Sequence, residues 1–251
     1  MDLYYELLAK PVFGIRYVEQ FYGNESTART ALGRLVAKGQ VLKIRQNMYT
    51  CSSGRDGSPI ASRFQIASAI TDSSFISHHS AMEYYGVTDQ VFYDVYVGST
   101  RRFREFEFDG YYYRCVLSAF SAGVERPEYG GGIAVSDRER TVVDSIKDLD
   151  HISGLEEVLS NVADMKMLNE EKLIQYLHLY ENQFLYQKCG FILKQNQNLH
   201  GLSDHFFDIC NAHIGKSKRY LTTDLSEAVV YDSNWQLVVP ENIYRLKNGV
   251  G

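Results

Sequence analysis

The feature that most constrains this chain is a tract rich in Ser and Gly at residues 51–59, CSSGRDGSP, which shows no hydrophobic periodicity. This composition is typical of a loop or linker, because Gly and Ser favour turns over helices and strands. The tract leaves a short segment before it and a body of 192 residues after it, long enough to bury a core of its own. We therefore predict a first domain at 1–52, a linker at 53–59 and a second domain at 60–251.

The two segments differ in charge. Residues 1–50 hold seven Lys or Arg against four Asp or Glu, a net charge of +3, so the other 201 residues carry −8 within a total of −5. The excess is concentrated at 24–50, where five basic residues face one acid. A basic end on an acidic body suits binding of a polyanion through the first segment. With 45% apolar and 23% charged residues, the chain cannot be disordered throughout.

Apolar spacing predicts three helices in the first segment, at 2–9, at 15–21, and from Asn24 or Ser26 to Gly39. The third helix repeats its apolar residues with a helical period, which predicts one buried stripe formed by Ala28, Ala31, Leu32, Leu35 and Val36.

Two extended runs, 41–45 and 48–51, follow the helices and are joined by two residues, as in a hairpin. Three helices and a hairpin form a winged helix-turn-helix, whose third helix lies in the major groove of DNA.

This arrangement predicts a DNA-binding surface. Arg forms bidentate hydrogen bonds with guanine, Thr contacts base edges, and cations on the hairpin contact phosphates. The residues on the outward face of the third helix are Thr27, Arg29, Thr30, Arg34 and Lys38, and those on the hairpin are Lys43, Arg45, Gln46 and Asn47. The same charges also fit a solvated face, or a winged helix that binds protein. Because one such domain makes few phosphate contacts, a homodimer on paired half-sites is the natural form on DNA.

The body mixes helices and strands, so the predicted fold class is α+β, with a winged helix followed by a larger mixed α/β domain. Ser136 and Glu139 fit a capping box that opens a helix. The other predicted helices are at 60–70, 77–85, 154–163, 170–189 and 204–214, and the predicted strands are at 91–98, 103–116, 133–135, 218–222 and 235–239.

No complete catalytic site is predicted in the body. His79 and Glu83 share a helix face, but a third metal ligand at suitable spacing is missing. Asp94 lacks the acids and lysine of an active nuclease site, and the glycines at 130–132 lack the Lys-Ser/Thr of a P-loop. The four scattered cysteines form no CxxC pair and are read as reduced thiols. We predict no catalytic residue, no metal and no cofactor.

Taken in order, four segments resemble the AbiEi-type antitoxin and transcriptional-regulator family of abortive-infection systems, over roughly residues 12–245. The first resembles its helix and wing, and the second its Ser-His helix start, with His78 and His79. The third resembles its E-R-T-x-x-D helix, with Glu139, Arg140, Thr141 and Asp144, and the fourth its closing strand. The segments read TARTALGRLVAKGQVLKIRQNMYT, FISHHSAMEYYGV, VSDRERTVVDSI and NWQLVVPENI. One departure is the wing turn, where Gln46-Asn47 replaces the family's frequent Arg-Gly.

The resemblance implies a two-part protein of a toxin-antitoxin, phage-defence operon. Its winged helix would repress that operon by binding inverted repeats in double-stranded promoter DNA. Its larger domain would counteract a nucleotidyltransferase-like toxin, by direct binding, through the toxin's target or by modifying the toxin. The acidic first residues lack a signal-peptide pattern and no apolar run suits a membrane span, so a cytoplasmic location without membrane contact is expected.

Two other functions fit the same residues. One is a stand-alone transcriptional regulator whose body senses a ligand or dimerises. The other is an enzyme that acts on nucleic acid brought in by the winged helix. A toxin gene next door would distinguish the first function from the stand-alone regulator, and metal-dependent cleavage of DNA or RNA would reveal the enzyme.

Overall fold

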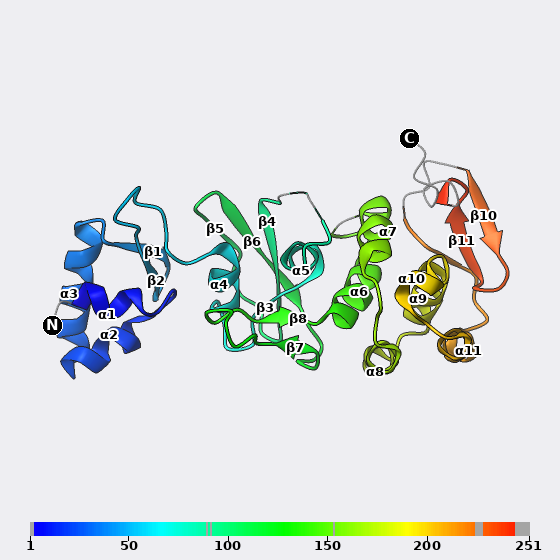
Figure 1. Cartoon of the computed structure of the whole chain (residues 1–251), viewed down its shortest axis with the longest axis horizontal. Helices are drawn as coiled ribbons and strands as arrows, with labels where there is room; N and C mark the ends of the chain where they lie inside the picture. Colours follow the sequence, from blue (N-terminus) through cyan, green and yellow to red (C-terminus); the bar gives the residue numbers. More distant parts are fainter. Residues whose placement is uncertain (1–2, 89, 91, 153, 224–227, 244–251) are drawn as a thin grey trace. The chain divides into compact units, whose positions relative to one another are not determined.

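The computed structural model describes residues 3–88, 90, 92–152, 154–223 and 228–243 and has the α+β class that the sequence predicts. Two compact units share the chain, and most of their elements are labelled in Figure 1. Unit 1 consists of Met1–Ile76 with Val91–Val135, and unit 2 of Ser77–Gln90 with Ser136–Gly251. No helix among the described residues has the length and hydrophobicity needed to span a bilayer.

Unit 1 begins with the predicted order of three helices and a hairpin. The elements are α1 (Leu3–Leu8), α2 (Ile15–Tyr22), α3 (Glu25–Ala37), β1 (Val41–Arg45) and β2 (Met48–Cys51). Gly23 ends α2 with a φ of 64°, and the side chain of Asn24 caps α3 by accepting a hydrogen bond from the Thr27 amide. The predicted stripe on α3 contributes Ala28, Leu32 and Leu35 to the core of this region.

The segment predicted as a linker folds into a closed loop. Ser52 and Pro59 form an isolated antiparallel bridge, and the Ser53 amide donates to the Ser58 carbonyl over 2.7 Å. The Ile60 amide then donates to the carbonyl of Cys51, so the two ends of the loop lie side by side. The predicted boundary at 53–59 stays a prediction, since the compact units divide the chain at other points.

A six-stranded mixed sheet follows in unit 1, with the order β5-β6-β4-β3-β8-β7. Its strands are β3 (Phe75–Ile76), β4 (Asp94–Ser99), β5 (Phe106–Phe108), β6 (Tyr111–Leu117), β7 (Val124–Glu125) and β8 (Val135–Ser136). The single strand predicted at 103–116 is wrong, because Asp109-Gly110 makes a two-residue turn with positive φ at both positions. Helix α4 (Arg63–Ser68), shorter than its predicted 60–70, lies against β3 and β4.

Unit 2 contains seven helices among its described residues and a small sheet of order β10-β11-β9. The helices are α5 (His78–Tyr84), α6 (Arg138–Lys147), α7 (Leu155–Asp164), α8 (Glu170–Tyr180), α9 (Gln183–Lys194), α10 (Gln197–His200) and α11 (Asp204–His213). The strands are β9 (Arg219–Tyr220), β10 (Val229–Asp232) and β11 (Leu237–Pro240).

Two of the sequence predictions in unit 2 are wrong. The helix predicted at 170–189 is two helices, because Glu181 takes the left-handed conformation and the Asn182 side chain caps α9. The capping box of Ser136 and Glu139 does not form. Strand β8 extends through Ser136, and Asp137 caps α6 instead by accepting a hydrogen bond from the Arg140 amide.

Gly190 in the middle of α9 allows a close approach by Trp235. A Cβ atom at Gly190 would lie 2.0 Å from a ring carbon of Trp235, which is buried against the helix. Gly33 on the exposed face of α3 has no neighbouring atom within 4 Å of the same position. Gly190 therefore allows close packing against Trp235, whereas nothing near Gly33 requires a glycine. Both glycines carry the same entropic cost.

We expect Gly190→Ala to lower the free energy of unfolding by about 1–3 kcal/mol, because the methyl group overpacks the indole. Gly33→Ala is the matched control and should raise it by about 0.5–1 kcal/mol through helix propensity alone. Urea unfolding followed by circular dichroism measures both changes. A Gly190→Ala protein as stable as the wild type would show that Trp235 does not pack on α9.

Candidate functional site

The predicted DNA-binding residues of α3 lie on its solvent face. Thr27, Arg29, Thr30, Arg34 and Lys38 are all exposed, on the side opposite the buried stripe. On the hairpin, Lys43, Gln46 and Asn47 are exposed as well. The structure therefore groups the predicted surface on one helix face and the neighbouring hairpin, as the amphipathic spacing indicates.

Four of these residues already have partners within the chain. The Thr30 hydroxyl donates to the Ser26 carbonyl over 3.0 Å. The guanidinium of Arg29 pairs with the carboxylate of Glu25 one turn earlier. Arg45 lies over the ring of Phe106, 5.0 Å from its centroid, and Asn47 accepts a hydrogen bond from the Ile15 amide over 2.8 Å. Asn47 thus fixes the start of α2, and Arg45 packs on β5. Arg34, Lys38 and Lys43 are the exposed cations best placed to contact a polyanion.

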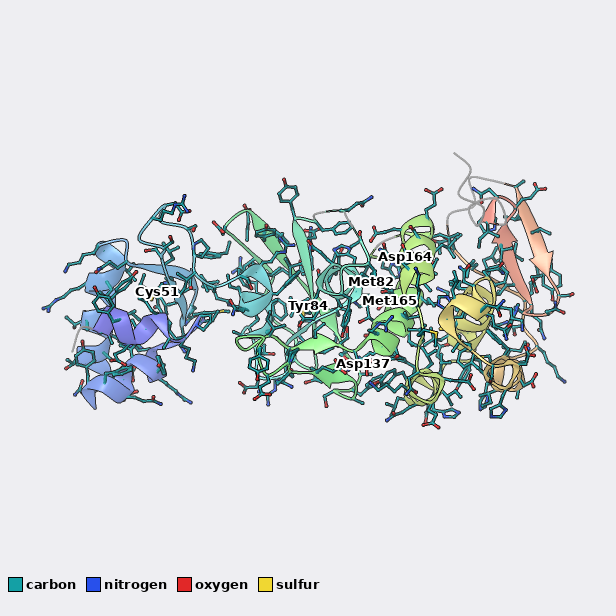
Figure 2. The ribbon with its side chains drawn as sticks, in the orientation of Figure 1. Cys51, Met82, Tyr84, Asp137, Asp164 and Met165 are labelled. Atoms are coloured by element: carbon teal, nitrogen blue, oxygen red, sulfur yellow. The ribbon has the colours of Figure 1, made fainter. Side chains whose placement is uncertain are left out.

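The six motif residues predicted in the body come together in unit 2, but as a buried network. Glu139, Arg140, Thr141 and Asp144 are all buried on α6, and His78 and His79 are buried on α5, which packs against α6. Asp137, which is labelled in Figure 2, lies at the start of α6. It accepts hydrogen bonds from Tyr176 over 2.5 Å and from Lys172 over 3.0 Å. Glu139 accepts a hydrogen bond from the Asn169 amide.

Arg140 and Asp144 form the centre of this network. The Arg140 side chain has no exposed area, and its Nε donates to Asp144 over 3.3 Å. The other carboxylate oxygen of Asp144 accepts a hydrogen bond from the Tyr180 hydroxyl over 2.5 Å. Burial first, then the neighbouring Asp144 carboxylate, raises the pKa of Tyr180 far above its usual value, so the phenol remains a donor.

The two histidines hold α5 to the helices beside it. His78 contacts Asp148 through Nε2 over 3.2 Å and Ser77 through Nδ1 over 3.0 Å. Burial acts to raise the pKa of Asp148, but the hydrogen bond from His78 and the charges of His78 and Lys147 outweigh it and lower that pKa to about 2. His79 lies 3.7 Å from a carboxylate oxygen of Glu157 on α7.

This geometry places the motif in the interior of unit 2. Thr141 donates a hydrogen bond to the Ser136 carbonyl. Every motif residue is buried, so none presents a free surface to a partner. The sequence analysis missed Asp137, Asp148, Tyr176 and Tyr180. The i, i+4 spacing of the two tyrosines and the position of Asp137 before the helix were the signals available.

Asp94, which is not predicted to belong to an active nuclease site, pairs with an arginine of unit 1. Arg114 donates to Asp94 over 3.2 Å and to Glu105 over 3.3 Å, so a cation of the chain itself bridges these two acids. Among the residues that the structure describes, no three His, Cys, Asp or Glu side chains are grouped to hold a metal ion. His79 has Glu157 as its carboxylate neighbour.

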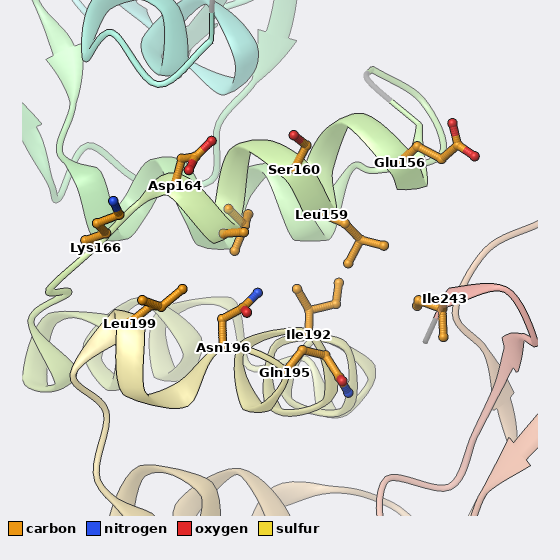
Figure 3. A pocket seen from close by; sticks show the side chains of 12 residues that line it. Glu156, Leu159, Ser160, Asp164, Lys166, Ile192, Gln195, Asn196, Leu199 and Ile243 are labelled. Atoms are coloured by element: carbon orange, nitrogen blue, oxygen red, sulfur yellow. The ribbon is translucent and has the colours of Figure 1, made fainter. Parts of the chain in front are cut away.

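Unit 2 also carries a pocket of about 600 Å³ between α7 and the pair α9 and α10. Leu159 and Ile192 point toward one another across it, with Asn196 and Leu199 on the same side as Ile192 (Figure 3). Its lining mixes apolar side chains with the polar Ser160, Gln195 and Asn196 and the charged Glu156, Asp164 and Lys166. A concave surface that combines apolar side chains with polar and charged groups suits a small molecule.

We expect the Arg140–Asp144 pair to behave as a buried unit. Arg140→Met should lower the free energy of unfolding by about 3–5 kcal/mol, because it leaves the Asp144 carboxylate buried without its cation. The double variant Arg140→Met/Asp144→Leu should cost less than the two single variants added together, since no lone charge remains. Urea unfolding of the four proteins measures the coupling.

Arg29 and Glu25 provide the matched control, because they have the same i, i+4 spacing at 66% and 52% exposure. Replacing both, as Arg29→Met/Glu25→Leu, should change stability by no more than about 0.5 kcal/mol. Equal coupling energies for the two pairs would show that burial adds nothing to the Arg140–Asp144 contact.

Comparisons with known proteins establish the fold. No protein-family model and no curated protein matches the chain. The structure is similar to the crystal structure of the RV2827C protein from Mycobacterium tuberculosis, with a TM-score of 0.63 and 14% sequence identity. The similarity covers 98% of this chain and 92% of that one. At this identity it shows that the two chains share a fold along almost their whole length.

Proposed function

We propose that this protein is an antitoxin and autoregulatory repressor, which binds promoter DNA through α3 and the β1–β2 hairpin and counteracts a toxin through unit 2. The observation that carries the proposal is the exposed cationic face of α3, opposite its buried stripe, in a three-helix and hairpin arrangement. The order of the four family-like segments supports the antitoxin part. Direct binding of the toxin, or action at the toxin's target, requires no catalysis by the chain and no cofactor.

On DNA, α3 would lie in the major groove, where Arg34 and Thr30 would read base edges. Lys38 and Lys43 would neutralise phosphates beside the groove. Arg29 would contribute only after exchanging the Glu25 carboxylate for a base or phosphate. Because these few contacts give weak binding, we propose a dimer on inverted repeats.

Toward the toxin, unit 2 would act through its surface, since its motif residues are buried. This unit holds 12 Lys or Arg against 19 Asp or Glu, a net charge of −7. An acidic surface complements a basic one, and it speeds the encounter of the two proteins. A nucleotidyltransferase-like toxin with a basic surface is therefore the partner we propose, bound directly or opposed at its target.

The first test addresses DNA. Arg34→Ala should weaken binding to the inverted repeats upstream of the gene by about 1–3 kcal/mol, because it removes a base contact. Lys43→Ala should weaken binding to all sequences alike and reduce the salt dependence by about one phosphate contact. Fluorescence anisotropy at several salt concentrations distinguishes the two effects. Arg126→Ala, an exposed cation after β7, is the control and should bind as the wild type does.

Equal affinities for all four proteins, with their folds intact, would remove this surface from DNA binding. The exposed cations of α3 would then be a solvated or protein-binding face.

The second test addresses the toxin. Co-expression with the product of the adjacent gene should restore growth when that product is toxic. Arg34→Ala, expressed from an unrelated promoter, should protect cells as well as the wild type does, because unit 2 is unchanged. Growth curves at matched protein levels measure the protection. Loss of protection in Arg34→Ala would place the antitoxin function on the DNA-binding surface. Absence of protection by the wild type would reject the proposed antitoxin function.

The pocket between α7 and α9 favours a second candidate function, a stand-alone regulator that senses a small molecule. Such a regulator would bind the same promoter without protecting cells from any neighbouring protein. A promoter affinity that changes when a metabolite fills the pocket would support it.

A further inference from the structure

A second, smaller cavity of about 210 Å³ lies in unit 2 at the beginning of α9. Its polar lining consists of Lys147, Asp150, His151, Asn182 and Lys188, and Phe184 forms part of its wall. None of these residues belongs to the pocket between α7 and α9, and none belongs to the proposed DNA-binding surface. The cavity is therefore a separate feature of the fold.

Lys188 is the unusual residue in this cavity, because its side chain is only 5% exposed. Its ammonium group lies 4.7 Å from the centroid of the Phe184 ring, one turn nearer to the start of the helix. The lysine stem thus runs back along α9, as long side chains on helices do. The Lys188 ammonium makes no hydrogen bond or ion pair with any residue that the structure describes.

The electrostatic setting of this ammonium group is unfavourable in the empty cavity. It lies near the positive end of the α9 dipole, where an anion is stabilised and a cation is not. Burial lowers the pKa of Lys188. The nearby carboxylates of Asp150 and Asp148 oppose that shift, and the charge of Lys147 adds to it. Two lysines thus line one small cavity, and only the ammonium group of Lys147 has an ion-pair partner, Asp148, among the described residues.

The acids nearby are engaged with other groups. Asp150 accepts hydrogen bonds from the Thr222 hydroxyl over 2.5 Å and from the Thr223 amide over 3.2 Å. Asp148 contacts His78 and Lys147, at 3.2 and 2.5 Å. Neither acid forms an ion pair with Lys188 among the described residues. The Lys188 ammonium therefore has no anionic group within ion-pair distance in that part of the chain.

We propose that this cavity binds a tetrahedral oxyanion, that is, inorganic phosphate or the phosphate group of a larger ligand. The Lys188 ammonium donates to the oxyanion. Lys147, which keeps its contact with Asp148, donates a second hydrogen bond from the end of α6. The positive end of α9 adds to the attraction. The Asn182 side chain already accepts from the Phe184 and Leu185 amides, so the two lysines carry the recognition.

Isothermal titration of the full chain with inorganic phosphate tests the site, in chloride buffer of matched ionic strength. The wild type should bind one phosphate, and Lys188→Met should bind about tenfold more weakly or not detectably, since it removes a charge-assisted hydrogen bond. Lys188→Met keeps the stem and removes a buried charge, so it should fold with a melting temperature no lower than that of the wild type.

Lys194→Met is the matched control, because Lys194 lies on the same helix, over the Phe207 ring, outside the cavity. This variant should bind phosphate as the wild type does. Phosphate should also raise the melting temperature of the wild type and of Lys194→Met, but not that of Lys188→Met. Titration with acetate distinguishes a tetrahedral oxyanion from any small anion.

Absence of phosphate binding by the wild type would overturn the proposal, and so would equal binding by Lys188→Met. Equal affinity for acetate would overturn the preference for a tetrahedral oxyanion. These measurements use neither promoter DNA nor a toxin, so their failure leaves the proposed function untouched.

Discussion

Unit 2 depends on the pairing of buried charges along α6. Residues 139–146 of this helix are all buried, although five charged or hydroxylated side chains are among them. Burying a charge costs free energy unless a partner of good geometry replaces water. Arg140 and Tyr180 provide that partnership for Asp144, and Lys172 and Tyr176 provide it for Asp137. Directional contacts therefore fix how α6 and α8 lie against each other, beyond what apolar packing alone would require.

The two proposed activities place opposite demands on the chain. Binding of DNA needs cations that are exposed and only weakly paired, which is the state of Arg34 and Lys43 in unit 1. The buried network of unit 2 needs every charge to be paired within the protein. Separate compact units let one chain meet both demands, because a charge added to the DNA-binding face leaves the network intact.

Local periodicity predicted the helices and hairpin of unit 1 well, since each has one buried and one exposed face. It failed where several faces are covered. Arg140 and Asp144 have the spacing of an exposed helical pair, and only their tertiary neighbours show that they are buried. The break at Glu181 was missed because a non-glycine residue adopts the left-handed conformation there. Lys188, the proposed oxyanion-binding residue, lies on an apolar helix face that the sequence pattern predicts to be core.

The path of the chain has a consequence for biosynthesis. The segment Ser77–Gln90, which includes α5, is made before the second part of unit 1, yet its helical partner α6 begins only at Arg138. Since domains fold as their residues leave the ribosome, α5 must wait for about 50 further residues before it can bury His78 and His79. During that interval its apolar and histidine-bearing face is open to solvent or to a chaperone. The order of synthesis thus makes unit 1 the first unit whose residues are all available for folding.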